Sequence, residues 1–286
     1  MSSSLGCLIF CFSLLSSLVF SGVEAAEASE PTFRSENTLA LSGFRTGLQF
    51  QSNTGFRYAL WEEEGNVLRQ NTGVIGAASL VVSPAHARAG AQLTVSPLAI
   101  FDLHLYAGAV SYFGNFQTVV GYPESSVAVG SNSEIAEWVE STGNQAPGLG
   151  LVLGVRGVGK IQVGPVVGLL SAEVSHWRVS SEVEGAWFFE REKEVLVQLG
   201  EDEILDLNGL LLYEREARRF DTIRWGSFTT WRYGFGTQDS LVRSGVLLSL
   251  GQGIARHNLV VQPYLLSRSF SPSGLPYMAY ALQLVR

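Results

Sequence analysis

Apolar and polar residues alternate along most of the chain. Between Arg88 and Ser96 the even-numbered positions hold polar residues or glycine, and the odd-numbered positions hold Ala, Leu or Val. Between Phe101 and Ala109 the odd-numbered positions are again apolar, and Ile, Trp, Tyr and Phe recur at odd-numbered positions between Ile223 and Phe235. A repeat of two residues gives a β-strand one polar and one apolar face. The pattern therefore predicts an all-β protein.

Turn-forming residues divide this pattern into thirteen candidate strands. Turns are expected where Gly, Pro, Asn and Ser gather, at 52–55, 64–66, 96–97, 159–160 and 272–274. The candidate strands are 39–50, 55–61, 72–83, 88–96, 100–113, 149–158, 161–178, 186–198, 208–216, 222–235, 241–250, 258–268 and 277–285. The stretch 103–123 has no charged residue and is long enough for a membrane helix, but its alternation favours a strand.

The longest interruption of the pattern is a polar, acidic segment at 121–148. Within it, Ser131 and Glu134 have the spacing of a capping box. This spacing predicts one or two helical turns at 131–140.

Two β architectures use the faces of such strands in opposite ways. A soluble sandwich buries its apolar faces, whereas a transmembrane barrel turns them toward lipid around a polar lumen. Several candidate strands have about 10–14 residues, near the about 9–11 that a tilted strand needs to cross a bilayer. Bacterial single-chain barrels have even strand numbers. We therefore expect a transmembrane antiparallel up-and-down β-barrel of about twelve strands, within a range of ten to fourteen.

Aromatic residues near strand ends also favour the barrel, because such barrels carry aromatic girdles at both membrane interfaces. The expected girdle residues are Trp61, Tyr112, Trp177, Trp187, Trp231 and Phe235.

The first 25 residues have the form of a secretory signal peptide. An apolar, Ser-rich run at 5–20 precedes Val23-Glu24-Ala25, a small-x-small triplet, so we expect cleavage after Ala25. No Lys or Arg precedes the run, which leaves an uncleaved anchor as the alternative. The two cysteines, Cys7 and Cys11, both lie in this run. The mature chain is thus expected to have no disulfide and no thiolate chemistry.

A signal peptide, a cysteine-free mature chain and long alternating strands together resemble bacterial outer-membrane β-barrel proteins. The resemblance covers residues 38–286 and is to the class, not to one family. It implies a signal peptide at 1–25, a periplasmic segment at 26–37, and an outer-membrane barrel at 38–286 with a long loop at 121–148. It also implies contact with outer-membrane lipid and lipopolysaccharide, and insertion by the barrel assembly machinery. Members of the class commonly end in an aromatic residue; this chain ends in Arg286, which removes the usual assembly signal or moves it to Tyr280.

The composition agrees with a barrel whose outer surface faces something other than water. The 286 residues are 46% hydrophobic and 16% charged, below the about 25% charged residues of soluble domains. The net charge of −7 excludes the basic face of a general nucleic-acid-binding protein.

Few residues suit catalysis. Asp102 and His104 share one strand face, but no nucleophilic serine accompanies them, so a hydrogen-bonded pair inside the barrel is the better interpretation. Ser175 and His176 are adjacent and therefore point to opposite faces. Residues 154–160 resemble a phosphate-binding loop, but no Ser or Thr follows the lysine. We expect no enzyme activity, no metal site and no cofactor.

Arginines recur on the polar faces, where a barrel would place its lumen. The expected lumen residues are Arg45, Arg88, Asp102, His104, Arg224, Arg232 and Arg268. Arginines lining a pore attract anions; alternatively each pairs with Asp102, Glu173 or Glu214 in a plugged polar core. His86, two residues after Pro84, is expected in a solvated loop.

These expectations favour a passive, porin-like channel for small polar solutes, anionic ones among them. The alternative is a non-conducting structural or surface-interaction barrel that acts through the 121–148 loop. A lipid-modifying enzyme of the outer membrane and a secreted β-sandwich binding protein are less favoured. Side chains fill the interior of an eight-stranded barrel, whereas a barrel of 16–18 strands leaves a channel. A barrel of twelve strands lies between these two cases.

Overall fold

The computed structural model describes residues 30–42, 47–60, 68–69, 72–114, 119–124, 129, 131–217, 220–269 and 276–285. The expected signal peptide, Arg45 and Trp61 lie outside the described residues.

The described chain is built almost entirely of strands. The strands are β1 (Thr32–Ser42), β2 (Leu48–Ala59), β3 (Gly73–Val82), β4 (His86–Leu98), β5 (Phe101–Tyr112), β6 (Gly121–Tyr122), β7 (Gly148–Val163), β8 (Val166–Ser181), β9 (Trp187–Glu190), β10 (Val195–Gln198), β11 (Asp202–Arg215), β12 (Thr222–Gly234), β13 (Ser240–Gln252), β14 (Ala255–Gln262), β15 (Tyr264–Ser267) and β16 (Tyr277–Val285). One helix, α2 (Asn132–Thr142), lies between β6 and β7.

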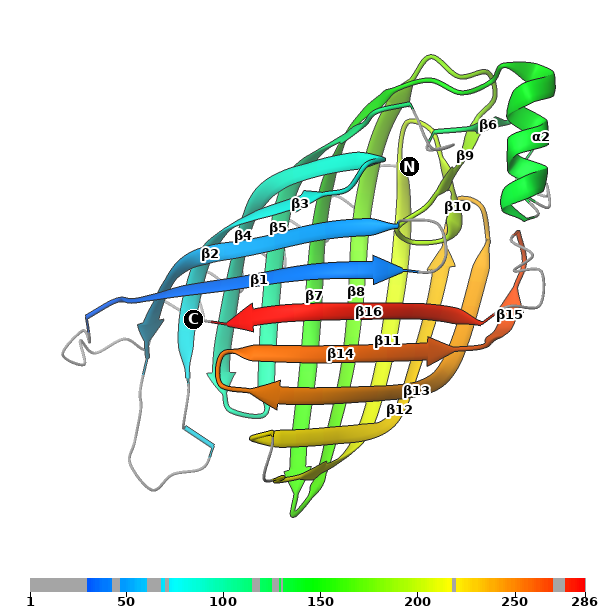
Figure 1. The fold of residues 1–286 in the computed structure, drawn as a ribbon. Coiled ribbons are helices and arrows are strands. Elements are labelled where there is room, and N and C mark those ends of the chain that lie inside the picture. The colour runs from blue at the N-terminus through cyan, green and yellow to red at the C-terminus, as the bar shows by residue number, and fades with distance from the viewer. Residues whose placement is uncertain are drawn as a thin grey trace.

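Twelve strand positions close into one antiparallel barrel (Figure 1). The order around the wall is β1-β2-β3-β4-β5-β7-β8-β11-β12-β13-β14-β16, and pairing of β16 with β1 completes the ring. β14 and β15 share one position, because both pair with β13 and Pro263 separates them. The prediction of a twelve-stranded transmembrane-type barrel is confirmed.

The surplus candidate strand is 186–198. It forms the hairpin β9–β10, which pairs with β6 in a separate three-stranded sheet rather than in the wall. Both of its strands are short apolar runs without alternation, buried on both sides. Such runs read as strands in the sequence but give no sign of where they pack.

Several predicted turns and boundaries are wrong. Residues 52–55 lie inside β2, 96–97 inside β4 and 159–160 inside β7. Small and polar residues mark turns in soluble proteins, but here they also face a polar lumen. For the same reason β1 begins at Thr32, ahead of the expected barrel start at residue 38, and candidate strand 39–50 includes both the end of β1 at Ser42 and the start of β2 at Leu48.

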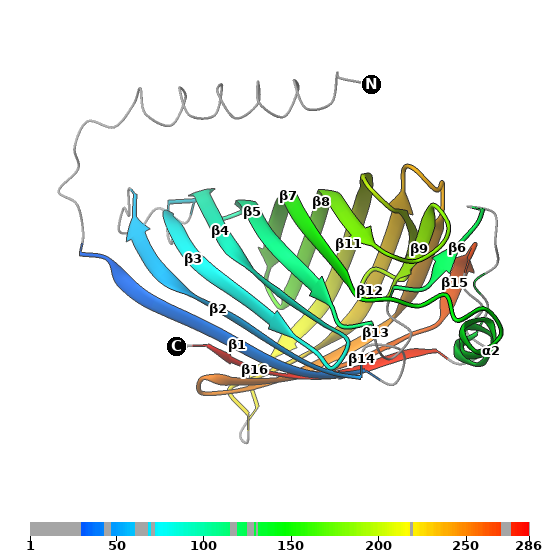
Figure 2. The same cartoon turned by 90° about the horizontal axis from the view of Figure 1, so that it is seen from above.

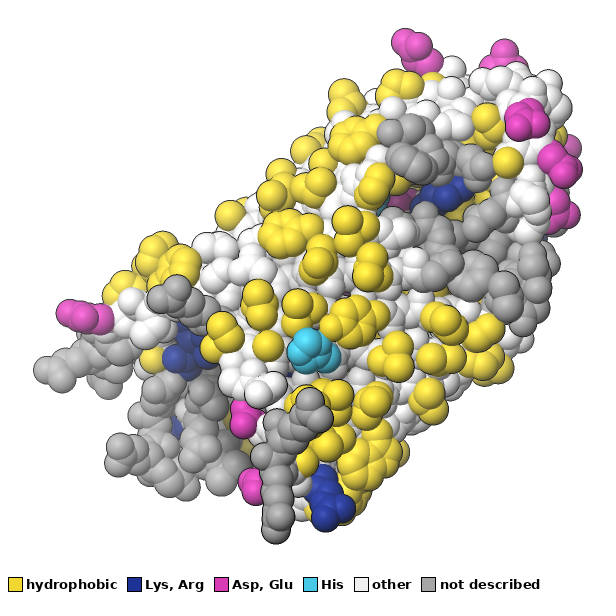
Figure 3. Space-filling model, in the orientation of Figure 1, with side chains coloured by type: hydrophobic (Ala, Val, Ile, Leu, Met, Phe, Trp, Pro, Cys, Tyr) yellow, Lys and Arg dark blue, Asp and Glu magenta, His cyan; other side chains and the backbone are white. Residues whose placement is uncertain are grey.

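Apolar side chains cover the outer wall (Figure 3). On β7, Leu149, Leu151 and Leu153 are 65%, 57% and 46% exposed, while the residues between them turn inward. Monomeric soluble proteins rarely expose continuous apolar surfaces of this size, so the wall faces lipid.

Within the ranges that the structure describes, no helix is long and apolar enough to cross a membrane. The uncharged stretch 103–123 holds most of β5, so the strand interpretation of its first part is correct.

The two ends of the barrel differ in loop length. The start of β1 and the end of β16 meet at one end, where Glu36 pairs with Val285. Two-residue turns at 99–100, 164–165 and 253–254 lie at the same end, together with the longer connections 60–72 and 216–221. The opposite end carries the segments 113–147 and 182–201, with α2 and β9 (Figure 2). Because outer-membrane barrels have short periplasmic turns and longer extracellular loops, the chain termini mark the periplasmic end.

Helix α2 follows the predicted capping box. The Ser131 side chain accepts from the Glu134 backbone N–H, and the Glu134 carboxylate accepts from the Ser131 backbone N–H. Gly143, at φ +65°, ends the helix in the left-handed conformation that glycine adopts at no steric cost. Ile135 is buried beneath the helix, and Trp138 stacks on Tyr122 at 5.8 Å between ring centroids.

Candidate functional site: a polar lumen closed by a hairpin

The loop between β8 and β11 folds back into the barrel as the hairpin β9–β10. Phe188, Val195 and Val197 pack on Trp177 and neighbouring wall residues in one apolar cluster. Phe189 and Leu196 pack on the other side in a second cluster, together with Ile135 of α2 and with Tyr122. These contacts hold the hairpin firmly, and its turn projects charged residues into the lumen. We call residues 190–194 the plug.

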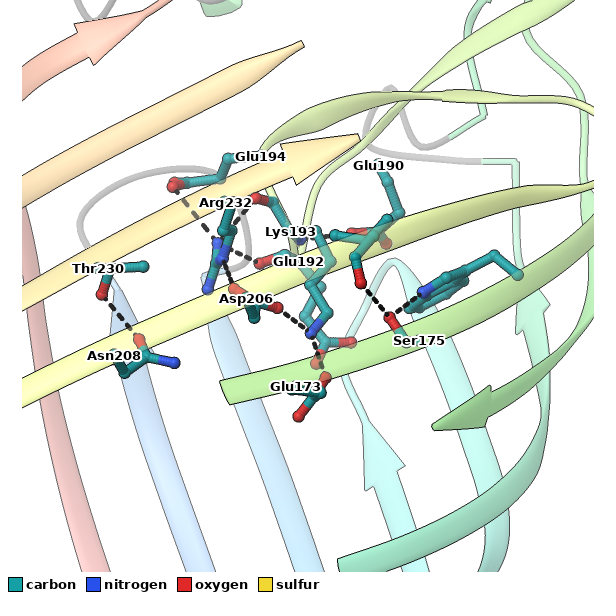
Figure 4. A network of polar contacts seen from close by, with 12 residues as sticks. Glu173, Ser175, Glu190, Glu192, Lys193, Glu194, Asp206, Asn208, Thr230 and Arg232 are labelled. Carbon is teal, nitrogen blue, oxygen red and sulfur yellow. Dashed lines mark hydrogen bonds and ion pairs between the residues drawn. The ribbon is translucent and has the colours of Figure 1, made fainter. Parts of the chain in front are cut away.

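Lys193 ties the plug to the wall strands β8 and β11. Its ammonium lies 2.5 Å from Asp206 Oδ2 and 2.9 Å from Glu173 Oε1 (Figure 4). The Tyr106 hydroxyl also donates to Glu173, at 2.9 Å. The Asp206 side chain is buried, and those of Lys193 and Glu173 are only 11% and 14% exposed.

Arg232 of β12 makes a second set of contacts. Its Nε donates to Asp206 Oδ1 at 2.6 Å. Its Nη1 donates to the backbone carbonyls of Lys193 and Glu192, at 2.8 and 3.2 Å. One guanidinium therefore holds both the charged partner of Lys193 and the backbone of the plug.

Glu194 connects the plug to β13 and β15. Its carboxylate lies 2.7 Å from Arg243 Nη1 and accepts from the Tyr264 hydroxyl at 3.1 Å. Arg243 is 4% exposed and also lies over the Tyr277 ring, 3.9 Å from its centroid. Glu194 has φ +57°, a left-handed conformation that costs a non-glycine residue roughly 1–2 kcal/mol. The buried ion pair with Arg243 helps to offset this strain.

Glu192 reaches the other side of the lumen, where β4 lies. It accepts from Arg88 Nη2 at 3.2 Å, and its second oxygen is 3.5 Å from His86 Nε2. His86 is 2% exposed, so its predicted place in a solvated loop is wrong. In the sequence, Pro84 indicates only a turn. It gives no sign that the hairpin β9–β10 covers His86.

Ser83, His86 and Glu192 follow one another in the order of a nucleophile, a base and an acid. Ser83 Oγ lies 3.1 Å from His86 Nδ1. However, Ser83 is 5% exposed and already accepts from the backbone N–H groups of Ala85 and His86. The hydroxyl thus stabilises the β3–β4 turn.

The charges of the plug are fixed by their wall partners. Burial opposes the ionisation of Glu192, yet the facing Arg88 holds the pKa of Glu192 far below its ordinary range. Burial also opposes the charge of Lys193, yet Asp206 and Glu173 raise the pKa of Lys193 above its ordinary value. Both plug residues are therefore charged at neutral pH.

Two adjoining cavities occupy the lumen on the periplasmic side of the plug. The larger, about 500 Å³, is lined by Ala99 in a periplasmic turn. The smaller, about 420 Å³, ends at Glu192 and Lys193. They share the lining residues Glu36, Asn53, Gln92 and His104. Open space thus extends from the periplasmic end to the plug.

Five of the expected lumen residues lie on inward positions of the wall: Arg88, Asp102, His104, Arg224 and Arg232. Arg224 forms an ion pair with Glu214 on the neighbouring strand. Asp102 pairs with Lys160 at 2.5 Å and accepts from Ser96 at 2.7 Å. His104 instead bonds Thr94 and Gln92. Asp102 and His104 are therefore neighbours without the hydrogen bond that we expected.

Arg268 does not lie on the lumen wall. It is exposed in the bend after β15 and donates to the Gln238 carbonyl at 2.7 Å. A bulge in the β13–β15 pairing breaks the alternation just before it. An extra residue in one strand moves the residues that follow it to the opposite face. Gln262 and Arg268 are both even-numbered, but the bulge lies between them, so Gln262 faces inward and Arg268 does not.

The girdle predictions separate into two groups. Trp231 and Phe235 are exposed on the outer wall, at 39% and 47%. Tyr112 and Trp177 are buried inside, where Tyr112 donates to Glu190 and Trp177 to Ser175. Trp187 lies in β9 of the hairpin, packed against the second apolar cluster.

The outer wall carries further exposed aromatic residues near the periplasmic end that the sequence reasoning missed: Phe33, Phe56, Tyr58, Phe101, Tyr213 and Trp225. Sequence reasoning also missed the inner residues Lys193 and Asp206. Lys193 is one of two lysines in the chain and belongs to a run of five charged residues, 190–194, between two short apolar stretches, which is the signal that could have found the plug.

A closed antiparallel barrel with an apolar outer wall and a charged lumen defines the class. The protein is a bacterial outer-membrane β-barrel.

No family model matches the sequence, and the search of curated proteins finds no match either. Among solved structures, the chain is similar to the β domain of the Bordetella autotransporter BrkA, with a TM-score of 0.46 and 10% identity over 90% of this chain and 99% of that one. It is also similar to the translocator domain of the autotransporter NalP from Neisseria meningitidis (TM-score 0.33, 9% identity, 99% and 96% covered). A third is OmpT, an outer membrane protein of Vibrio cholerae (TM-score 0.34, 8% identity, 91% and 100% covered). The class rests on the geometry of the barrel itself.

Proposed function

We propose that this protein is a small-solute channel of the outer membrane that its own hairpin holds closed. The observation that carries the proposal is the span of the plug. Arg88 lies on β4 and Arg243 on β13, six strand positions apart in a ring of twelve. Glu192 pairs with the first and Glu194 with the second. The plug therefore bridges opposite walls.

The lumen below the plug supports a transport role. A barrel that served only as a rigid platform would gain stability from a filled core, whereas this one holds two adjoining cavities lined by charged and amide side chains. Solute enters from the periplasmic end and meets the plug before it can pass through.

Planar-bilayer recording tests the proposal. In the key variant, Arg191–Glu194 is replaced by Asn-Gly, which forms the two-residue turn favoured in hairpins and removes the charged side chains of the turn. The matched control places Asn-Gly at the two-residue periplasmic turn Gly253-Ile254. We expect the wild type and the control to stay closed apart from rare openings, and the plug variant to conduct steadily.

A heat-modifiable gel shift verifies that each variant is folded. A plug variant that is folded but silent at all voltages would overturn the channel. It would favour the non-conducting alternative, in which α2 and the hairpin form a rigid extracellular surface through their shared apolar cluster.

A further inference from the structure

Arg156 is a lumen cation without a partner. It lies on β7, where it pairs in register with His104 on β5 and with Glu173 on β8. No described residue forms an ion pair or hydrogen bond with its guanidinium, and its Nε is buried and unsatisfied. Glu173, the nearest carboxylate in register, is already engaged by Lys193 and Tyr106. Arg156 is half-buried as a residue, but a buried N–H donor without an acceptor is costly unless a ligand supplies one.

Asn53 presents the opposite deficiency in the same cavity. Its side-chain oxygen is buried and accepts no hydrogen bond within the described chain. Asn53 and Arg156 both line the 420 Å³ cavity beneath the plug. The cavity thus combines an unused cationic donor with an unused neutral acceptor.

His104, the register partner of Arg156, adds a donor to the same cavity. Gln92 Nε2 can only donate, so His104 Nδ1, 3.1 Å away, accepts this hydrogen bond. The neutral ring therefore carries its proton on Nε2. His104 lines both cavities.

Taken together, the two cavities have a charge of opposite sign to that of the whole protein. Seven cations and five carboxylates line the two cavities: Arg34, Arg57, Arg88, Arg156, Lys160, Lys193 and Arg232 against Glu36, Asp102, Glu173, Glu192 and Asp206. The chain as a whole has a net charge of −7. The 420 Å³ cavity itself is lined by four cations and four carboxylates, so the excess lies in the 500 Å³ cavity on the periplasmic side, where it concentrates anions along the approach to Arg156.

We propose that the cavity beneath the plug binds a small hydroxylated carboxylate, such as a sugar acid. Arg156 holds the carboxylate through charge-assisted hydrogen bonds, and Asn53 accepts a hydrogen bond from a ligand hydroxyl. A volume of about 420 Å³ lies within the range of known small-molecule sites. This inference rests on the proposed function, because it names the solute class that the channel would take.

Calorimetric titration of the full mature protein in detergent tests the site with three probes that share a six-carbon chain. Gluconate has both a carboxylate and hydroxyls, hexanoate has only the carboxylate, and sorbitol has only hydroxyls. Titration of each probe into protein-free micelles corrects for partitioning. We expect gluconate to bind at least 10-fold more tightly than hexanoate, and sorbitol not to bind.

Variants assign the contacts. Arg156→Gln should weaken gluconate binding at least 10-fold, and Asn53→Leu should reduce it to the level of hexanoate. The matched control is Arg224→Gln, because Arg224 is an inner-wall arginine that is paired with Glu214 and lies outside both cavities. Equal binding of sorbitol and gluconate, or unchanged binding in Arg156→Gln, would overturn the site.

Binding is measured without conduction, so the site and the channel can fail separately. Gluconate binding by a barrel that never conducts would overturn the channel alone. A conducting plug variant that binds no gluconate would overturn the site alone. In the conducting variant, Arg156→Gln should also shift the reversal potential in a KCl gradient toward cation selectivity.

Discussion

Replacement of Lys193 by Met should open the barrel. The change keeps most of the apolar stem of the side chain but removes the ammonium that lies 2.5 Å from Asp206 and 2.9 Å from Glu173. Loss of one partner of a buried ion pair costs about 3–5 kcal/mol. We take the lower end, about 3 kcal/mol, because Asp206 keeps Arg232 and Glu173 keeps the Tyr106 hydroxyl.

The expected change in open probability depends on which state, closed or open, loses the ion pairs of Lys193. The ion pairs form only when the plug is docked, so the cost falls on the closed state. Since about 1.4 kcal/mol corresponds to a factor of ten, the ratio of open to closed channels should rise on the order of 100-fold. Single-channel recordings of open probability measure this ratio directly.

Lys160 provides the control. It is the only other lysine of the chain, and it also pairs with a lumen carboxylate at 2.5 Å, Asp102. Its side chain is 40% exposed and does not touch the plug, so Lys160→Met should cost no more than about 1 kcal/mol of stability and leave the open probability unchanged. If both methionine variants open equally, or if Lys193→Met stays closed, the reasoning about the plug is refuted.

Two further predictions concern packing and pH. Gly154→Ala should lower the free energy of unfolding by about 1–3 kcal/mol, because a Cβ there lies 2.2 Å from the Tyr106 ring; Gly209→Ala, whose Cβ meets nothing within 4 Å, should change it little. Urea titration followed by the heat-modifiable band compares them, and equal midpoints would contradict the packing argument. The raised pKa of Lys193 keeps its contribution to closure complete below about pH 10.4, and the contribution is lost as pH rises through the raised pKa. The lowered pKa of Glu192 keeps its contribution complete above about pH 4.3, and this is lost as pH falls. Openings should therefore increase as pH falls below about 4.3 and as pH rises above about 10.4 in bilayer recordings; an unchanged open probability at both extremes would argue against ionic closure.

The wall of the barrel could be predicted because the sequence of each strand alone shows which of its faces is apolar and which is polar. Alternation is a local property, and the lipid outside and the polar lumen inside impose it on every wall strand. The same rule, applied strictly, would have corrected two girdle predictions. Tyr112 has the parity of Asp102 on β5, and Trp177 has the parity of Glu173 on β8, so both belong inside. Position near a strand end predicts girdle residues less well than the alternation of faces does.

The plug could not be predicted, because its contacts join distant segments. Arg88 and Glu192 are 104 positions apart and meet only when the sheet closes. Neither residue belongs to a motif, and the turn that carries Glu192 looks like a break in an apolar strand. Arg156 was missed for a different reason: its importance lies in lacking a partner, which only the arrangement of neighbouring strands reveals.

The placement of the plug between β8 and β11 has a consequence for how the protein assembles. These two strands are direct neighbours in the wall, so the hairpin can form early from a continuous stretch of chain. Its ionic partners on β4 and β13, however, lie far apart in an open sheet and approach each other only as the sheet curls. The pairs of Glu192 and Glu194 can therefore form together only in a barrel that is closing, and their energy favours the closed ring over every partly inserted sheet. We therefore expect the hairpin to favour closure of the barrel during assembly, in addition to the transport role proposed above.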